Sequence, residues 1–165
     1  MATFQTCSVL FTICLVISRT MDHGSMVLGC APCNTGWIEF GNRCHLFVKK
    51  QKSFQDAEAY CQGLSRPGRP AHLMSINSEE ENNFLMKYTS VIGQRRLWIG
   101  YFKSATPKWL DGSQDSYVNW FPGESNVASS TPCVNMAPSG RWRDVQSCDT
   151  IFPFVCEMPY RFTSK

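Results

Sequence analysis

The sequence predicts an α+β fold stabilised by disulfide bonds, with two helices flanking small antiparallel sheets. Two observations carry this prediction. Segments rich in β-branched and aromatic residues outnumber the segments with helical spacing, and the two helical segments both lie in the first 90 residues. Nine cysteines in 165 residues, seven of them after residue 29, are typical of a disulfide framework formed in an oxidising compartment.

Residues 1–18 are predicted to be a signal peptide. They carry no charged side chain, and their apolar centre, 7–17, is shorter than the roughly 20 residues that span a bilayer. Val16 and Ser18 are the small residues expected before cleavage after Ser18, and a membrane anchor is the alternative. We therefore expect a secreted, extracellular protein with no membrane span in the mature chain, a short N-terminal segment over 19–29 and one domain over 30–160.

Composition excludes several classes of function. The formal charge of +3 is mild, and the basic runs "KK" and "QRR" are short, so we interpret them as solvated surface and expect no nucleic-acid partner. The sequence contains no G-x-S-x-G, no H-E-x-x-H and no phosphate-binding glycine loop. We therefore expect a binding protein and not an enzyme.

The first half of the domain alternates strands and helices. The turn signal "GNR" separates two β-prone stretches in "WIEFGNRCHLFVKK", which predicts a hairpin. In "SFQDAEAYCQGL", Ser53 is a favourable N-cap and apolar residues recur at helical spacing, until "RPGRP" ends the helix. After a short strand, "AHLMSI", either Asn77 or Ser78 caps a second helix over "EEENNFLMKY", whose acidic first turn is favoured by the helix dipole.

The second half is predicted to consist of strands and one long loop. "LWIGYF" is a compact apolar strand, and "PKWLDGS" is a strand entering a turn. From Gln114 to Pro132 the periodicity disappears while Gly, Pro, Ser and Asn accumulate. "CVNMA" and "FPFVCEM" are the closing strands, with "SGRWRDVQSC" between them. Binding sites commonly lie on such long loops, so we expect the function there.

Six landmarks, in order, resemble the C-type lectin-like domain over Cys33 to Met158. They are "CNTGWIEFGNRC", "SFQDAEAYC", "HLMSINSEEENNFL", "LWIGY", "WLDGS" and "RWRDVQSCDTIFPFVCEM". The single module with a leader is similar to fish lectins, pancreatic stone-type proteins, venom lectins and type II fish antifreeze proteins. The resemblance implies three disulfide bonds: Cys33–Cys44, Cys61–Cys156 and Cys133–Cys148. These pairs leave Cys30 over, either as a free thiol or as the link of a disulfide-bonded homodimer. The alternative pairs Cys30, in place of Cys33, with Cys44.

The long loop resembles the family's shared calcium and sugar site. In sugar-binding members a Glu-Pro-Asn motif, an acid near the next cysteine and a Trp-Asn-Asp motif supply oxygen ligands. By this resemblance Glu124, Asn126 and Asp144 are the candidate calcium ligands. With Arg143 they are also the candidate carbohydrate ligands.

Three departures from that pattern weaken the metal site. Thr131 stands where the second acid is expected, and Arg143 replaces an amide ligand with a side chain that only donates. Ser125 replaces the proline, so the preceding bond is expected to be trans, because a cis bond before a non-proline residue costs about 3–4 kcal/mol. The sequence predicts weak calcium binding or none, and no other cofactor.

The leading hypothesis is a secreted lectin of innate immunity that binds carbohydrate, including glycans on microbial surfaces, through the Glu-Ser-Asn and Trp-Arg-Asp segments. One alternative is a non-glycan protein that binds a protein ligand as a Cys30-linked dimer; another is an ice binder like the type II antifreeze proteins. Tyr117, Trp120 and Phe121 are candidate stacking residues for a sugar. Burial in the core is the favoured interpretation for Trp98 and Trp120.

Overall fold

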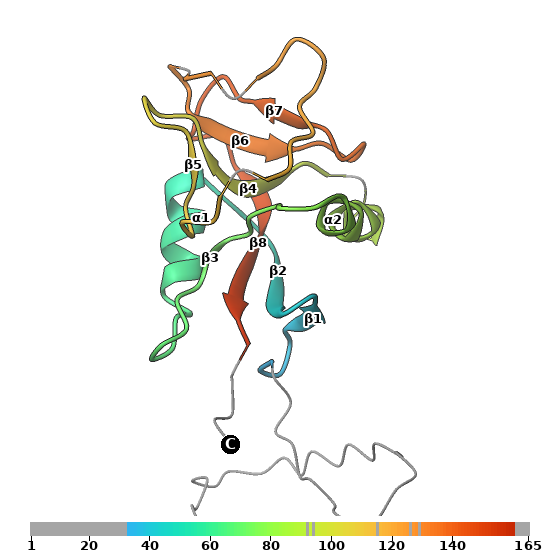
Figure 1. The fold of residues 1–165 in the computed structure, drawn as a ribbon, viewed down its shortest axis with the longest axis vertical. Coiled ribbons are helices and arrows are strands. Elements are labelled where there is room, and N and C mark those ends of the chain that lie inside the picture. The colour runs from blue at the N-terminus through green and yellow to red at the C-terminus, as the bar shows by residue number, and fades with distance from the viewer. Residues whose placement is uncertain are drawn as a thin grey trace, which may run out of the picture. The chain divides into compact units, whose positions relative to one another are not determined.

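The computed structural model describes residues 33–160, except 92, 94, 115, 126 and 129. The predicted signal peptide, the segment 19–29, Cys30 and Asn126 lie outside the described residues. In chain order (Figure 1), the elements are β1 (Ile38–Phe40), β2 (Arg43–Lys52), α1 (Phe54–Gln62), β3 (His72–Leu73), α2 (Glu79–Val91), β4 (Leu97–Phe102), β5 (Lys108–Trp109), β6 (Cys133–Met136), β7 (Trp142–Asp144) and β8 (Phe152–Pro159). Neither described helix is long and apolar enough to cross a membrane.

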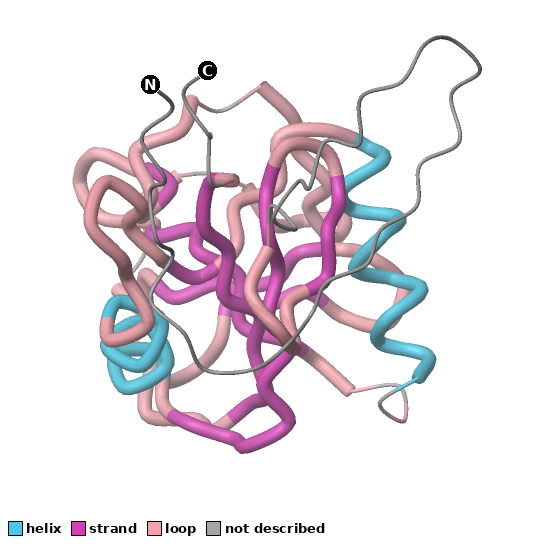
Figure 2. Tube along the Cα trace, turned by 90° about the horizontal axis from the view of Figure 1, so that it is seen from below, coloured by secondary structure: helices cyan, strands magenta, loops and turns pink. Residues whose placement is uncertain are grey.

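The strands form one connected sheet with the order β1-β2-β8-β4-β6-β7, while β3 pairs with β8 and β5 pairs with β4. Most pairings are antiparallel, but β4 and β8 meet in parallel at Trp98 and Phe154. The α+β class is confirmed, and the small sheets expected from the sequence are joined into a single mixed sheet. The two helices flank the strands (Figure 2).

Both helices begin where the sequence predicts. Ser53 caps α1, because its Oγ accepts a hydrogen bond from Asp56 N at 3.2 Å. Of the two candidate caps for α2, Ser78 takes the role: its Oγ accepts from Glu81 N at 3.2 Å. Glu81 Oε2 in turn accepts from Asn77 N at 2.6 Å, a reciprocal arrangement close to a capping box.

Aromatic side chains fill the core beneath the long loop. Trp98, Trp109 and Trp142 are fully buried. Trp142 lies edge-on to Trp109 and to Trp120, with ring centroids 5.4 Å apart in both pairs. The predicted burial of Trp98 is confirmed, whereas Trp120 packs against the separate cluster of Trp109 and Trp142 and remains partly exposed. The loop therefore rests on a rigid aromatic base.

Gly100 explains the glycine in the "LWIGYF" strand. Its backbone N donates to Met74 O at 2.8 Å, so the chain after β3 passes directly over β4. A Cβ at this position would overlap the carbonyl oxygen of Leu73. Only glycine permits this close approach of two backbones.

The structure contains the three disulfides that the resemblance implies: Cys33–Cys44, Cys61–Cys156 and Cys133–Cys148. The second has a sequence separation of 95 and joins α1 to β8, so in the chain-entropy picture it contributes the most, about 4–5 kcal/mol. Cys33, and not Cys30, is the partner of Cys44.

Candidate functional site

The long loop pairs with β7 through backbone hydrogen bonds. This strand lies in the segment between the two closing strands, where periodicity does not predict it. Trp120 and Trp142 form an isolated bridge. Phe121 N donates to Trp142 O at 2.9 Å, and Trp142 N donates to Asn119 O at 2.9 Å. This pairing holds the loop so that Glu124 comes beside the two residues that follow Trp142.

Three of the four predicted site residues are in contact. Glu124 Oε2 accepts a hydrogen bond from the backbone N of Asp144 at 3.3 Å. Its Oε1 lies 3.7 Å from Arg143 Nε. The bond between Glu124 and Ser125 is trans, as the sequence predicts. The fourth residue, Asn126, lies outside the described residues.

Lys103 is the site residue that sequence reasoning missed. Its Nζ donates to both carboxylate oxygens of Asp144, each at 2.8 Å. The lysine side chain is 3% exposed, and its Nζ lies 5.1 Å from the centroid of the Trp120 ring. Lys103 directly follows β4, and it reaches Asp144 because β6 pairs with both β4 and β7. That contact depends on strand register, and the sole local signal is a lysine ending an apolar strand.

The described side chains of this cluster do not fit a calcium ion. The cluster carries two negative formal charges, on Glu124 and Asp144, and two positive ones, on Lys103 and Arg143, so it is balanced without a metal. At an effective dielectric of 20, two like unit charges 4 Å apart repel by about 4 kcal/mol, and a divalent ion doubles that opposition. Within the described part of the chain, no group of three His, Cys, Asp or Glu residues is placed to hold a metal.

Arg143 and Phe121 form the exposed edge of the cluster. The guanidinium carbon of Arg143 lies 4.4 Å from the centroid of the Phe121 ring, and the two residues are 36% and 37% exposed. Trp120 and Tyr117 instead pack against Trp142. Among the three candidate stacking residues, Phe121 is therefore the one whose ring lies at the surface beside the polar groups.

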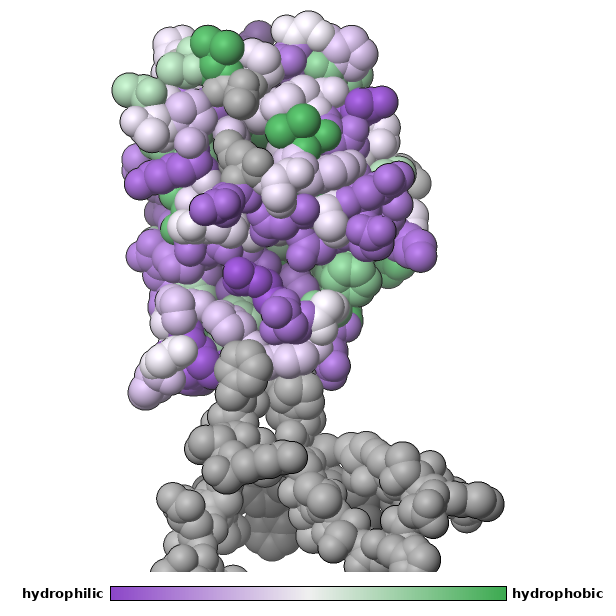
Figure 3. All heavy atoms as spheres, viewed as in Figure 1, coloured by the Kyte–Doolittle hydropathy of each residue, from purple (hydrophilic) through white to green (hydrophobic). Residues whose placement is uncertain are grey.

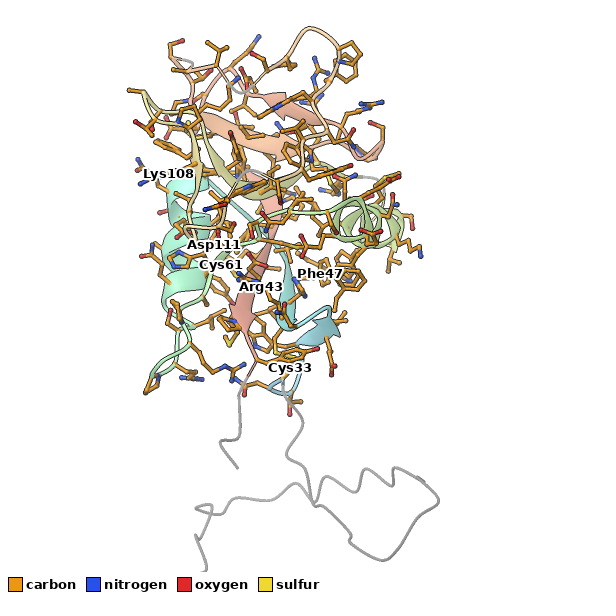
Figure 4. All side chains as sticks on the ribbon, viewed as in Figure 1. Cys33, Arg43, Phe47, Cys61, Lys108 and Asp111 are labelled. Carbon is orange, nitrogen blue, oxygen red and sulfur yellow. A yellow bond between two sulfur atoms is a disulfide. The ribbon has the colours of Figure 1, made fainter. Side chains whose placement is uncertain are left out.

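A second polar cluster lies in the middle of the domain, away from the predicted site (Figure 4). Arg43 Nη2 lies 3.2 Å from Asp111 Oδ2, and its Nη1 lies 3.6 Å from Glu157 Oε1. Ser75 Oγ lies 2.6 Å from Glu157 Oε1 and 3.0 Å from Asp111 Oδ2, so its single O–H donates to one of the two carboxylates at a time. This cluster joins β2, β8 and the turn after β5, so its geometry indicates a structural role.

The comparisons with known proteins agree with this architecture. The Lectin C-type domain family matches residues 50–158. A protein named Lectin from Pleurodeles waltl is 39% identical over 133 residues, which cover 76% of this chain and 75% of that protein.

Two solved structures share the fold. Human lithostathine has a TM-score of 0.66 at 27% identity, over 77% of this chain and 90% of that one. A calcium-independent type II antifreeze protein has a TM-score of 0.65 at 27% identity, over 78% of this chain and 95% of that one. The chain therefore belongs to the C-type lectin domain family, whose members are binding proteins rather than enzymes.

Proposed function

We propose that this chain is a secreted glycan-recognition protein whose long-loop site works without calcium. The observation that carries the proposal is the bidentate contact of the Lys103 ammonium with Asp144. A buried lysine supplies a fixed positive charge where the family's sugar-binding pattern implies a metal ion. The charge that holds the Asp144 carboxylate is therefore part of the chain itself.

The surface beside Lys103 has the groups that a sugar needs. Glu124 offers acceptor oxygens, and Arg143 offers donors on the guanidinium edge that faces away from Glu124. The exposed Phe121 ring supplies an apolar face for the C–H side of a pyranose. Figure 3 shows one face of the domain, on which hydrophilic residues dominate and hydrophobic ones form small separate groups.

Secretion is part of the proposal. Three disulfides within one domain are typical of a protein that folds in an oxidising compartment. The apolar stretch at 7–17, with no charge in the first 18 residues, supports a leader that delivers the chain there.

The test is glycan binding with and without a chelator. The purified, disulfide-intact chain is applied to a glycan array and its best ligand is then titrated in solution, in calcium and in EDTA. We expect equal affinity in both buffers. Loss of binding in EDTA contradicts calcium independence, and an array without signal in either buffer contradicts glycan recognition.

A variant tests whether glycan binding without calcium depends on Lys103. Lys103→Met removes the ammonium and leaves the Asp144 carboxylate without it, so we expect the glycan affinity in EDTA to fall by about tenfold or more. Lys87→Met removes an exposed lysine on α2 and is the matched control. Equal affinities for the two variants in EDTA would show that Lys103 does not organise the site.

Ice binding is the second candidate, because the fold and sequence are similar to a calcium-independent type II antifreeze protein. Against it, the loop presents a mixed cluster of acids and bases and not a flat, weakly charged surface. Growing ice crystals in a dilute solution of the chain separates the two functions: faceted crystals favour the antifreeze function, and rounded discs exclude it.

A further inference from the structure

The second half of β2 contains a bulge that opens a cavity. Val48 pairs with Phe154 and Lys52 pairs with Phe152, so the three residues between them on β2 face the single residue Pro153 on β8. Proline has no N–H to donate, so the ladder cannot continue at this point. The resulting cavity has a volume of about 410 Å³ and is lined by Lys49, Gln51, Val91, Arg95 and Pro153.

Two basic runs that are far apart in the sequence meet at this cavity. Lys49 belongs to the "KK" run and Arg95 to the "QRR" run, which the sequence alone suggested were merely solvated surface. With the Gln51 amide oriented to suit its neighbours, its oxygen accepts from Arg95 Nη1 at 2.9 Å and its nitrogen donates to Ile151 O at 3.3 Å. Gln51 thus holds the guanidinium at the cavity.

The charge of this cavity is not balanced by the residues that line it. Elsewhere in the described structure, Arg43, Lys103 and Arg143 each lie within 4.0 Å of a carboxylate. Among the described residues, Lys49 and Arg95 form no such ion pair, and no carboxylate is found in the lining. Two uncompensated cations in a concave site attract an anion.

We propose that this cavity binds the tetrahedral oxyanion of a sulfated or phosphorylated sugar. Arg95 supplies a fork of donors that matches two oxygens of the anion, and Lys49 supplies a compact positive charge. Val91, which is 73% exposed, and Pro153 form an apolar wall against which a sugar ring packs. The volume lies within the range of about 300–1,000 Å³ found for small-ligand sites. The described residues that line this cavity do not include Lys103, Glu124, Arg143 or Asp144.

The test is titration of the purified, disulfide-intact chain with four ligands at equal ionic strength: a sulfated disaccharide, the phosphorylated disaccharide, the unmodified disaccharide, and inorganic sulfate. We expect one or both of the charged sugars to bind and the unmodified sugar to bind at least about tenfold more weakly, because charge-assisted hydrogen bonds are lost. The ratio between the sulfated and phosphorylated sugars identifies the source of the oxyanion. Inorganic sulfate binding as tightly as either sugar would contradict the apolar wall.

Variants assign the binding to this cavity. The double variant Lys49→Gln/Arg95→Gln should lose at least about tenfold in affinity for the charged sugar, and Arg95→Lys should recover part of it relative to Arg95→Gln. Lys108→Gln removes the charge of an exposed lysine on β5 (Figure 4) and should bind as the unmodified chain does. Thermal melts of all variants confirm folding.

Three further outcomes overturn the proposal. They are no binding of either charged sugar, equal binding of the unmodified sugar, and an equal loss in Lys108→Gln, which would reduce the effect to net charge. Because Lys49 and Arg95 are remote in sequence from the long loop, the calcium-free glycan site is tested separately by Lys103→Met.

Discussion

Lys103 acts in this structure where the sequence pattern leads one to look for a metal. Its ammonium contacts both oxygens of Asp144 and lies against the Trp120 ring, so it is held from two sides. A bound metal is lost when its concentration falls, whereas a lysine is permanent. The proposed calcium independence therefore rests mainly on one side chain, and the departures at Ser125, Thr131 and Arg143 are consistent with it.

Arg143 is the residue whose substitution tests the exposed edge of the site. Arg143→Lys keeps the charge but loses the flat group that lies on Phe121, so we expect the glycan affinity to fall by about three- to tenfold while the thermal stability stays the same. Isothermal titration with the best array ligand measures this. Arg66→Lys, at an exposed arginine between α1 and β3, is the control. An unchanged glycan affinity in Arg143→Lys would show that the guanidinium takes no part in glycan recognition.

At the scale of elements, the sequence predicts the features that depend on contacts between residues close together in the chain. The starts of α1 and α2 could be predicted, because Ser53 and Ser78 make their capping bonds within three residues of themselves. The two-residue strands β3 and β5 fall within the predicted strands "AHLMSI" and "PKWLDGS", whereas periodicity does not predict the three-residue β7, because such a short strand exists only through pairing with distant partners.

The residues of the candidate site divide in the same way, into those that local motifs predict and those that only strand pairing brings together. Glu124 and Asp144 could be found from motifs that stand in the chain itself. Lys103 could not, since it meets Asp144 only through the register that sets Phe102 opposite Cys133 and Val134 opposite Asp144. The cavity lined by Lys49 and Arg95 is a further case, because these residues lie on β2 and before β4 and meet only in the folded chain.

A hydrogen bond between α2 and β7 supports the strand with which the long loop pairs, and one substitution removes this bond. Trp142 Nε1 donates to Asn82 Oδ1 at 3.0 Å, and both residues are buried. Asn82→Ala leaves the indole N–H without its acceptor, so we expect the free energy of unfolding to fall by about 1–3 kcal/mol in urea titrations. The neighbouring, exposed Asn83→Ala should stay within about 0.5 kcal/mol of the unmodified chain. Equal values for the two variants would contradict a supporting role for Asn82.

Over the whole domain, a disulfide and a cluster of charged side chains each join distant elements to β8. Cys61–Cys156 links α1 to β8, and the Arg43 cluster links β2 to β8 and to the turn after β5. Two carboxyl groups in this interior shift in opposite senses. Burial raises the pKa of Glu81, with the nearby Glu157 charge adding to the rise. Burial also acts to raise the pKa of Asp111, but hydrogen bonds from Ser113 and the Arg43 charge outweigh it and hold that pKa below its usual value.

Asp111 therefore makes part of the stability depend on pH. Because its pKa is lower in the folded chain, its contribution is fully present above its ordinary value of 3.8 and is lost as the pH falls through the lower folded value. Asp111→Asn should reduce the free energy of unfolding by about 1–3 kcal/mol at pH 7, because hydrogen bonds to a charged group are lost. The difference from the unmodified chain should shrink steadily below pH 3.8. Urea titrations between pH 2 and 7 measure both curves, with the exposed Asp149→Asn as control. Curves that stay parallel down to the lowest pH would show that the ionised form of Asp111 does not stabilise the fold.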